Sequence, residues 1–287
     1  MSAVLLACAS AVLFAAATVA IRLGLGRVAD PALGALVMSI VAFAVAGGVA
    51  ALTVRGGGAA PGALWPYFLA GFLAPGASQL FFFAAVAAAG PSRVSVVVGT
   101  APLFAVAMAL IVLDEPLQAG LVAGALLIVG GGLVLVSERI RPEDFRAVGV
   151  LFALAATVLF AARDNVVRWL TDESSAAPLA GAAASLLGGV LLIGTYRLVT
   201  GGPLTSLRRA FAIFAPAGML AGLSYVCLYE AYDRGRVSVV SPLVATESLW
   251  GVALSALVIG RKELVGRHLV LGAVLVVAGG VLIGATR

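Results

Sequence analysis

The chain has 287 residues, of which 62% are hydrophobic and only 11% charged, whereas soluble domains carry about 25% charged residues. A soluble chain of this composition could not cover its surface with polar groups, so the composition excludes a soluble globular domain and indicates an integral membrane protein. The net charge of +5 comes from scattered Arg and Lys residues without a basic stripe, so we predict no nucleic-acid partner.

Ten apolar runs follow one another along the chain, each close to the roughly 20 residues that a helix needs to cross a bilayer. The connectors between them are short and hold most of the Arg, Asp, Glu, Gly and Pro residues. We therefore predict an all-α integral membrane protein with ten transmembrane helices and the bilayer as its surroundings. The expected spans are 2–21, 32–54, 65–89, 92–113, 117–136, 147–167, 177–199, 210–232, 237–259 and 267–285.

The two halves of the chain repeat each other in four ordered matches. These are VLFAA at 12–16 and 158–162, GASQLFFFAA at 76–85 with GLSYVCLYEA at 222–231, RVSVV at 93–97 and 236–240, and GALLIVGGGLVL at 124–135 with GAVLVVAGGVLI at 272–283. The chain is thus expected to form two five-helix units, 1–140 and 141–287, within one transmembrane domain. Because five is odd, the second unit must enter the membrane from the opposite side, which makes an inverted repeat. In transporters of this kind the substrate site lies near the midplane between the halves, and access alternates by rocking.

Two further segments point to a known family. They are TAPLFAVAMALIVLDEPL at 100–117, followed by a glycine-rich helix, and ATESLWGVALSALVIG at 245–260. With the ten helices and the duplication, they make the chain resemble the EamA-like branch of the drug/metabolite transporter superfamily. The chain departs from the family pattern at Glu247-Ser248, where Glu-Pro is usual, and at Phe14, where tryptophan is frequent. The resemblance implies a small-molecule permease, often an exporter of amino acids or related metabolites, with cavity walls from helices 1, 3, 4, 6, 8 and 9.

The resemblance also bears on where the protein resides. An Arg-rich, Lys-poor composition suggests a bacterial source, and we expect a multi-pass protein of the bacterial inner (cell) membrane. The resemblance implies that both termini face the cytoplasm. The distribution of Arg and Lys among the connectors favours the reverse orientation. We follow the resemblance for this expectation.

Glu247 is the first candidate for the central chemistry, because it lies about eleven residues from each end of the ninth span. A charge at the bilayer centre costs about 3 kcal/mol, so this carboxyl group should face a cavity or a partner. In one interpretation it binds substrate or a coupled proton. In the other it is structural, capping a helix break or pairing with an Arg or Ser.

Arg163 and Asp164 interrupt the sixth span, opposite Ala17 and Thr18 of the first helix. The charge is therefore an addition to one half only, as a site for a ligand with two different ends would need. Two interpretations stay open. The pair lies at the mouth of the cavity, or it belongs to an interfacial ion-pair cluster in which Asp164 pairs with Arg168 at i, i+4.

Other candidates for substrate binding are less charged. Gln79 and Tyr225 are equivalent in the repeat, and either line the cavity or hydrogen-bond between helices. Phe14 and Phe160 are likewise equivalent, as cavity walls or as packing residues. Trp250 is expected beside the cavity, near the break of the ninth helix.

Pro102 and Pro242 are expected at helix breaks that allow gating, because proline removes a helical hydrogen bond. Glu230, an addition opposite Ala84, either lies at the membrane interface or faces the pocket, and His268 is expected at the interface.

The sequence contains no Cys/His metal spacing, no phosphate loop and no nucleophile motif, so we predict no enzyme activity, metal or cofactor. The hypothesis is a secondary transporter, an efflux permease, for a small organic solute, with a proton as a possible coupling ion. The alternative is a flippase for a lipid-linked substrate or a non-transporting membrane subunit. Substrate, direction and oligomeric state are not specified by the sequence.

Overall fold

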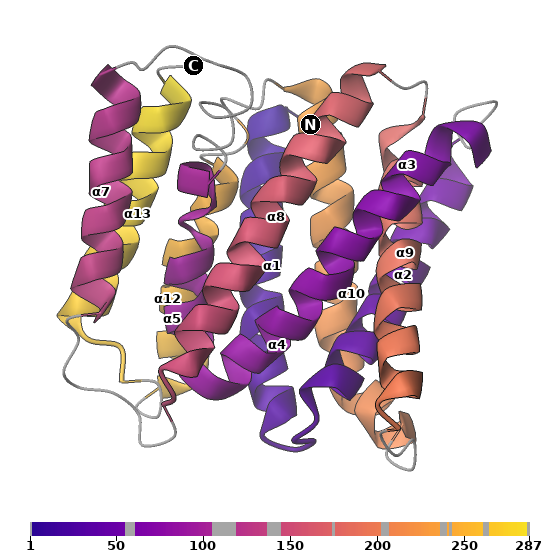
Figure 1. Cartoon of the computed structure of the whole chain (residues 1–287), viewed down its shortest axis with the longest axis horizontal. Coiled ribbons are helices and arrows are strands. Elements are labelled where there is room, and N and C mark those ends of the chain that lie inside the picture. The colour runs from indigo at the N-terminus through magenta and orange to yellow at the C-terminus, as the bar shows by residue number, and fades with distance from the viewer. Residues whose placement is uncertain are drawn as a thin grey trace.

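A computed structural model of the chain describes residues 2–54, 61–104, 119–136, 145–173, 176–201, 207–235, 240, 243–260 and 264–285. All secondary-structure elements in these ranges are helices, and they lie side by side in one bundle (Figure 1). The prediction of an all-α protein is confirmed.

The first half contributes α1 (Ala3–Leu25), α2 (Pro31–Thr53), α3 (Pro61–Gly71), the short π-helical segment η2 (Phe72–Ala77), α4 (Ser78–Ala89), α5 (Pro91–Val98) and α7 (Ala119–Val136). The second half contributes α8 (Val148–Glu173), α9 (Pro178–Val199), α10 (Leu207–Arg234), α12 (Glu247–Val258) and α13 (Arg267–Ala285). Taking α3, η2 and α4 as one interrupted span, they match the ten predicted spans in order.

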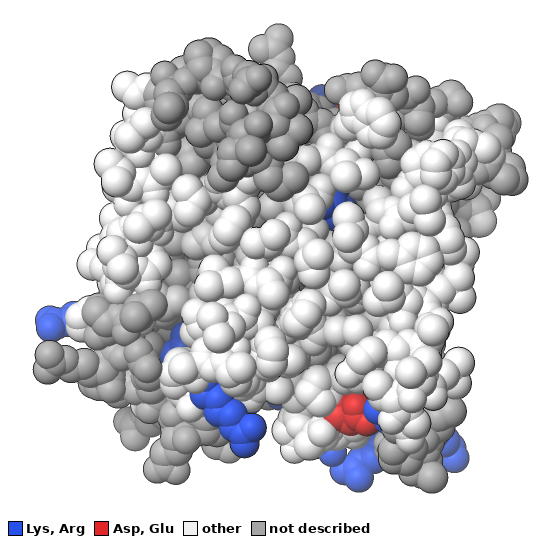
Figure 2. Space-filling view, viewed as in Figure 1, with Lys and Arg blue, Asp and Glu red and all other residues white. Residues whose placement is uncertain are grey.

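The bundle has the dimensions and surface of a membrane protein. Seven helical stretches among the described residues are long and apolar enough to cross a bilayer. The other three spans are represented by α5, α7 and α12. The face in Figure 2 is uncharged over most of its middle; charged side chains gather in its lower part, and a little blue shows in its upper half. In lipid, only a helix or a closed barrel satisfies its own backbone polar groups, so this belt accounts for the helical fold.

Packing between the halves follows an approximate twofold symmetry. Helix α1 packs against α10, and its counterpart α8 packs against α4, the counterpart of α10. Three pairs join equivalent helices of the two halves, namely α2 with α9, α5 with α12 and α7 with α13. Figure 1 shows α1 and α8 running in opposite directions, and the start of α1 and the end of α13 lying on the same side. This arrangement is the predicted inverted repeat.

An ion pair fixes one end of the α2–α9 contact. The Asp30 carboxylate caps α2 by accepting a hydrogen bond from the Leu33 backbone N–H at 2.9 Å, as expected for an aspartate directly before Pro31. The same carboxylate accepts a hydrogen bond from Arg197 Nη2 at 2.6 Å, near the end of α9. This link between the halves was not predicted from the sequence.

The third span is not the single regular helix that the sequence predicted. Ala74 has the non-helical angles φ −145° and ψ 124°, because Pro75 has no N–H to donate and its ring clashes with the preceding turn. The interruption is supported by α9, where the Ser185 hydroxyl donates to the Ala74 carbonyl at 3.3 Å. The equivalent α10 runs without a break from Leu207 to Arg234.

Helices α7 and α13 form a pair at one end of the bundle, on the left in Figure 1. Their backbones come close because glycines face each other. A Cβ atom on Gly131 would lie 2.7 Å from the Gly272 carbonyl oxygen, and one on Gly124 would lie 2.7 Å from the Gly279 carbonyl oxygen. Small residues of this kind drive helix association in lipid, where no hydrophobic force acts between helices.

Candidate functional site

A cavity of about 60 Å³ lies between the two halves of the bundle. Its walls come from α1, the segment that follows α5, α8, α10 and the start of α12. Most lining side chains are apolar or aromatic, and three are of the acidic or basic residue types Asp, Glu and Arg. The lining residues are Ser10, Phe14, Val98, Ala101, Pro102, Phe160, Arg163, Asp164, Ser224, Tyr225, Leu228, Tyr232, Val244, Ala245 and Glu247.

The walls differ from the expectation in one helix. Helices 1, 3, 4, 6, 8 and 9 were expected around the cavity, but no residue of the third span is among those that line it. The third span contributes from behind, because Phe82 of α4 packs against Phe14 and Phe160 with ring centroids 5.3 and 6.0 Å away. Its role is to support two aromatic walls.

Arg163 and Asp164 lie in the cavity wall and form an ion pair with each other. Arg163 Nε is 2.8 Å from Asp164 Oδ1, and Arg163 is only 5% exposed. Helix α8 continues to Glu173, about 15 Å beyond Arg163 at 1.5 Å per residue. The apolar part of the helix ends at Val167, as predicted, and the structure places Arg163 in the cavity wall. The predicted Asp164–Arg168 pair is not assessed, since the Arg168 side chain lies outside the described residues.

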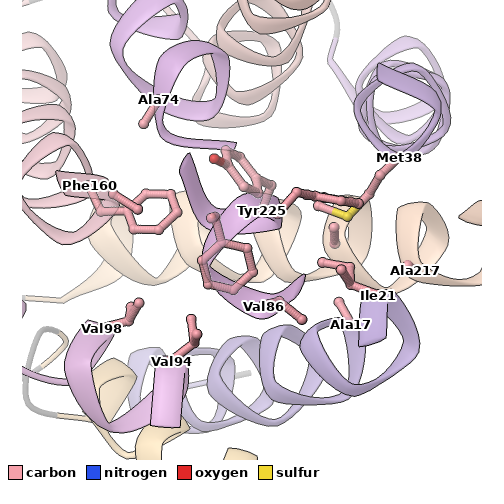
Figure 3. Close-up of a cluster of buried hydrophobic side chains, with 14 of the residues drawn as sticks. Ala17, Ile21, Met38, Ala74, Val86, Val94, Val98, Phe160, Ala217 and Tyr225 are labelled. Carbon is pink, nitrogen blue, oxygen red and sulfur yellow. The ribbon is translucent and has the colours of Figure 1, made fainter. Parts of the chain in front are cut away.

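Aromatic rings hold the Arg163 guanidinium in place. Its central carbon lies 5.1 Å from the centroid of the Tyr225 ring and 5.9 Å from that of the Phe160 ring. Both distances are within the range of a cation–π attraction. Phe160 and Tyr225 project from α8 and α10 into the same buried region, with Val98 nearby (Figure 3). The structure thus brings together Phe14, Phe160 and Tyr225.

Gln79 and Tyr225 occupy equivalent positions in the repeat but have different surroundings. Tyr225 lines the cavity, whereas Gln79 is 1% exposed and away from it. The Gln79 Oε1 atom has no hydrogen-bond partner among the described residues. The interruption at Ala74 precedes α4 by a few residues and has no counterpart in α10. Residues of α4 and α10 that are equivalent in the repeat therefore do not have equivalent neighbours.

Glu247 is the first residue of α12 and lines the cavity, with 7% of the residue exposed. Its carboxylate makes no hydrogen bond or ion pair with any described residue, and it lies within electrostatic range of Arg163 and Asp164. The partial positive charge at a helix start favours a carboxylate there. Glu247 is therefore a buried acid with an open side toward the cavity.

The remaining predicted residues are placed as follows. Trp250 is 44% exposed on the outside of α12 and does not line the cavity. Pro102 lines the cavity next to a turn at Gly99 and Thr100, where α5 ends. Pro242 lies outside the described residues. Glu230 is ion-paired with Arg234 one turn further along α10, and does not line the cavity.

Several cavity residues were not predicted from the sequence, of which Ser10, Ser224 and Tyr232 are polar. Helical periodicity could have found two of them. Ser10 precedes Phe14 by four residues and Tyr232 follows Tyr225 by seven, so each shares a helix face with a residue already chosen. Ser10 and Ser224 also join the halves, since each hydroxyl is within 3.1 Å of the other residue's carbonyl oxygen.

Two bundles of equivalent helices with a charged cavity between them define a multi-pass membrane transporter built as an inverted repeat. The profile of the EamA-like transporter family matches residues 1–137 and 147–285, so the chain belongs to this family, within the drug/metabolite transporter superfamily. Family members move small-molecule solutes across a lipid bilayer.

A search of solved structures agrees with the fold. One protein crystal structure is 20% identical in sequence, and the alignment covers 98% of this chain and 95% of that chain with a TM-score of 0.66. This likeness shows the fold alone. No curated protein matches the chain.

Proposed function

We propose that the protein is a secondary transporter of the bacterial inner membrane that exports small metabolites, such as amino acids or other amphipathic compounds, by alternating access. The observation that carries this proposal is the cavity between the halves, where Glu247, Arg163 and Asp164 lie among aromatic side chains. Charges at membrane depth are costly and mark a solute or ion pathway.

The small size of the cavity supports a mechanism in which the two halves move relative to each other. A volume of about 60 Å³ holds about two water molecules, so an organic solute enters only when the halves move apart. Helices α5 and α12 meet through small residues, because a Cβ atom on Gly99 would lie 2.8 Å from Ser248 Cβ. Such a contact can slide without separating interlocked side chains. In the proposed cycle Glu247 binds the cationic group of the solute or a coupled proton.

Transport by Glu247→Gln tests the role of the carboxylate. The purified variant and wild type would be reconstituted into vesicles and compared for uptake of radiolabelled amino acids and amines across a range of pH. We expect Glu247→Gln to lose transport or its dependence on pH. Glu230→Gln is the matched control, because Glu230 pairs with Arg234 outside the cavity, and it should behave as wild type. Full transport by Glu247→Gln with an unchanged pH profile would contradict a binding or coupling role.

One observation favours a second candidate, a flippase for a lipid-linked substrate. A lateral groove of about 480 Å³ opens between α2, α3 and α9, and all of its lining residues are apolar. An acyl chain would fit such a groove, but it shares no lining residue with the charged cavity. The vesicle assay separates the candidates, since a flippase would transfer labelled lipid between leaflets and accumulate no soluble solute.

A further inference from the structure

The charge in the central cavity is unbalanced. Arg163 and Asp164 neutralise each other across 2.8 Å, whereas the Glu247 carboxylate makes no ion pair with a described residue. Of the residues that line the cavity, Arg163 is the sole base. With Glu247 ionised, the cavity therefore carries one uncompensated negative charge. Because an unpaired buried carboxylate takes up a proton instead of keeping its charge, Glu247 is ionised only when a cation enters the cavity, and the cavity then accepts one positive charge.

The Arg163 guanidinium is poorly available to a substrate carboxylate. Asp164 lies at its Nε side and offsets its charge, and the rings of Tyr225 and Phe160 are within 6 Å. The Nη1 atom is buried and has no hydrogen-bond partner among the described residues, so Asp164 is the group that competes with a substrate carboxylate. A carboxylate that reached Arg163 would also lie near Asp164 and Glu247. Like charges in a site of low dielectric repel strongly. Asp164 thus blocks the anion site that Arg163 would otherwise form.

The other walls suit a cation with an apolar body. Phe14, Phe160, Tyr225 and Tyr232 line the cavity together with Glu247. Aromatic faces attract organic cations, and their area binds an apolar group without requiring a hydrogen bond. An amine without a carboxylate satisfies both features, while a zwitterion leaves its negative end unpaired.

We propose that Asp164 is a specificity-determining residue that makes the cavity prefer small organic monocations, such as amines with an apolar body, over amino acids and organic anions. This inference rests on the proposed function and narrows it, because it restricts the solutes of the same site from amino acids and amphipathic compounds in general to organic monocations. It also gives a reason for the pair of charges that the second half carries and the first half lacks.

The test uses three probes with the same ring and different charge: phenethylamine, phenylalanine and 3-phenylpropanoate. Binding to the purified full-length protein would be measured by isothermal titration calorimetry. We expect wild type to bind phenethylamine about tenfold or more tightly than phenylalanine, because repulsion of the carboxylate lowers the affinity for the zwitterion. Binding of 3-phenylpropanoate should be weakest. In Asp164→Asn the preference for the amine should shrink about tenfold or invert, since Arg163 is unmasked.

Asp30→Asn is the matched control, because Asp30 also pairs with an arginine, Arg197, but outside the cavity. It should keep the wild-type order of the three probes. Asn is close in shape to Asp, and a thermal melt of each variant shows whether it is folded. Equal affinity of wild type for phenethylamine and phenylalanine, no binding of phenethylamine, or an unchanged preference in folded Asp164→Asn would each overturn the inference. Because binding is measured without transport, a protein that binds the amine but moves no solute would refute the proposed function and not this inference.

Discussion

Helices α1 and α8 occupy equivalent places in the two halves, yet only α8 carries charge into the cavity. Where α8 has Arg163 and Asp164, α1 has Ala17 and Thr18. Thr18 satisfies its hydroxyl within its own helix, donating to the Phe14 carbonyl at 2.9 Å. Duplication has therefore preserved the packing role of this helix, while one copy has taken on the electrostatics of the site. The helix packing can therefore stay symmetric while the charges in the cavity differ between the two halves.

The largest expected effect comes from breaking the added pair. Arg163→Ala leaves Asp164, whose side chain is 27% exposed, without its partner. This should lower the free energy of unfolding by about 3 kcal/mol, the lower end of the range for a buried pair. The double variant Arg163→Ala/Asp164→Thr copies the first half and should recover most of this loss. Unfolding in detergent by SDS titration would measure both. A double variant as unstable as the single one would show that the charges themselves support the fold.

A smaller effect on stability is expected in the α7–α13 pair, where the equivalent helices of the two halves both present glycines. In Gly131→Val the new side chain would meet the Gly272 carbonyl oxygen, and overpacking of this kind costs about 1–3 kcal/mol. Gly130→Val on the same helix is the control, because a Cβ atom there has nothing within 4 Å. Melting temperatures of the two variants should differ clearly, and equal values would mean that the helices separate without penalty.

The smallest expected effect concerns a hydrogen bond present on one side only. Ser10 of α1 bonds Ser224 of α10, whereas the equivalent pair is Ala156 of α8 and Ser78 of α4, where the Ser78 hydroxyl has no partner among the described residues. Ser10→Ala should destabilise the protein by about 0.6 kcal/mol, the average for such bonds in membranes. Ala156→Ser should stabilise it by a similar amount. Unfolding titrations would detect both, and destabilisation by Ala156→Ser would show that this side has no room for a hydroxyl.

The spans and the duplication could be predicted because the bilayer imposes the length and composition of every helix. Arg163, Asp164 and Glu247 could be singled out for the same reason, since charge is rare at that depth. The sequence was a poorer guide to the direction in which each side chain faces. Trp250 follows Glu247 by three residues, about 60° around the helix axis, which is enough to move a side chain from the cavity to the lipid surface.

Interruptions were harder to foresee than spans. Pro75 could have indicated the break in the third span, but an apolar run of the right length concealed it. That break also explains why Gln79 and Tyr225 have different surroundings. Two residues that are equivalent in the repeat have similar neighbours only if their helices have the same shape.

The pairing of α7 with α13 has a consequence for biosynthesis. The glycine surface of α7 is complete once the first half has been made, but the surface it packs against, around Gly272 and Gly279, belongs to α13 of the second half. While the ribosome makes the intervening helices, α7 lies in the bilayer without α13 packed against it. Synthesis of α13 is thus the earliest moment at which this end of the bundle can close. Quality-control proteases that recognise unassembled helices have that interval in which to act.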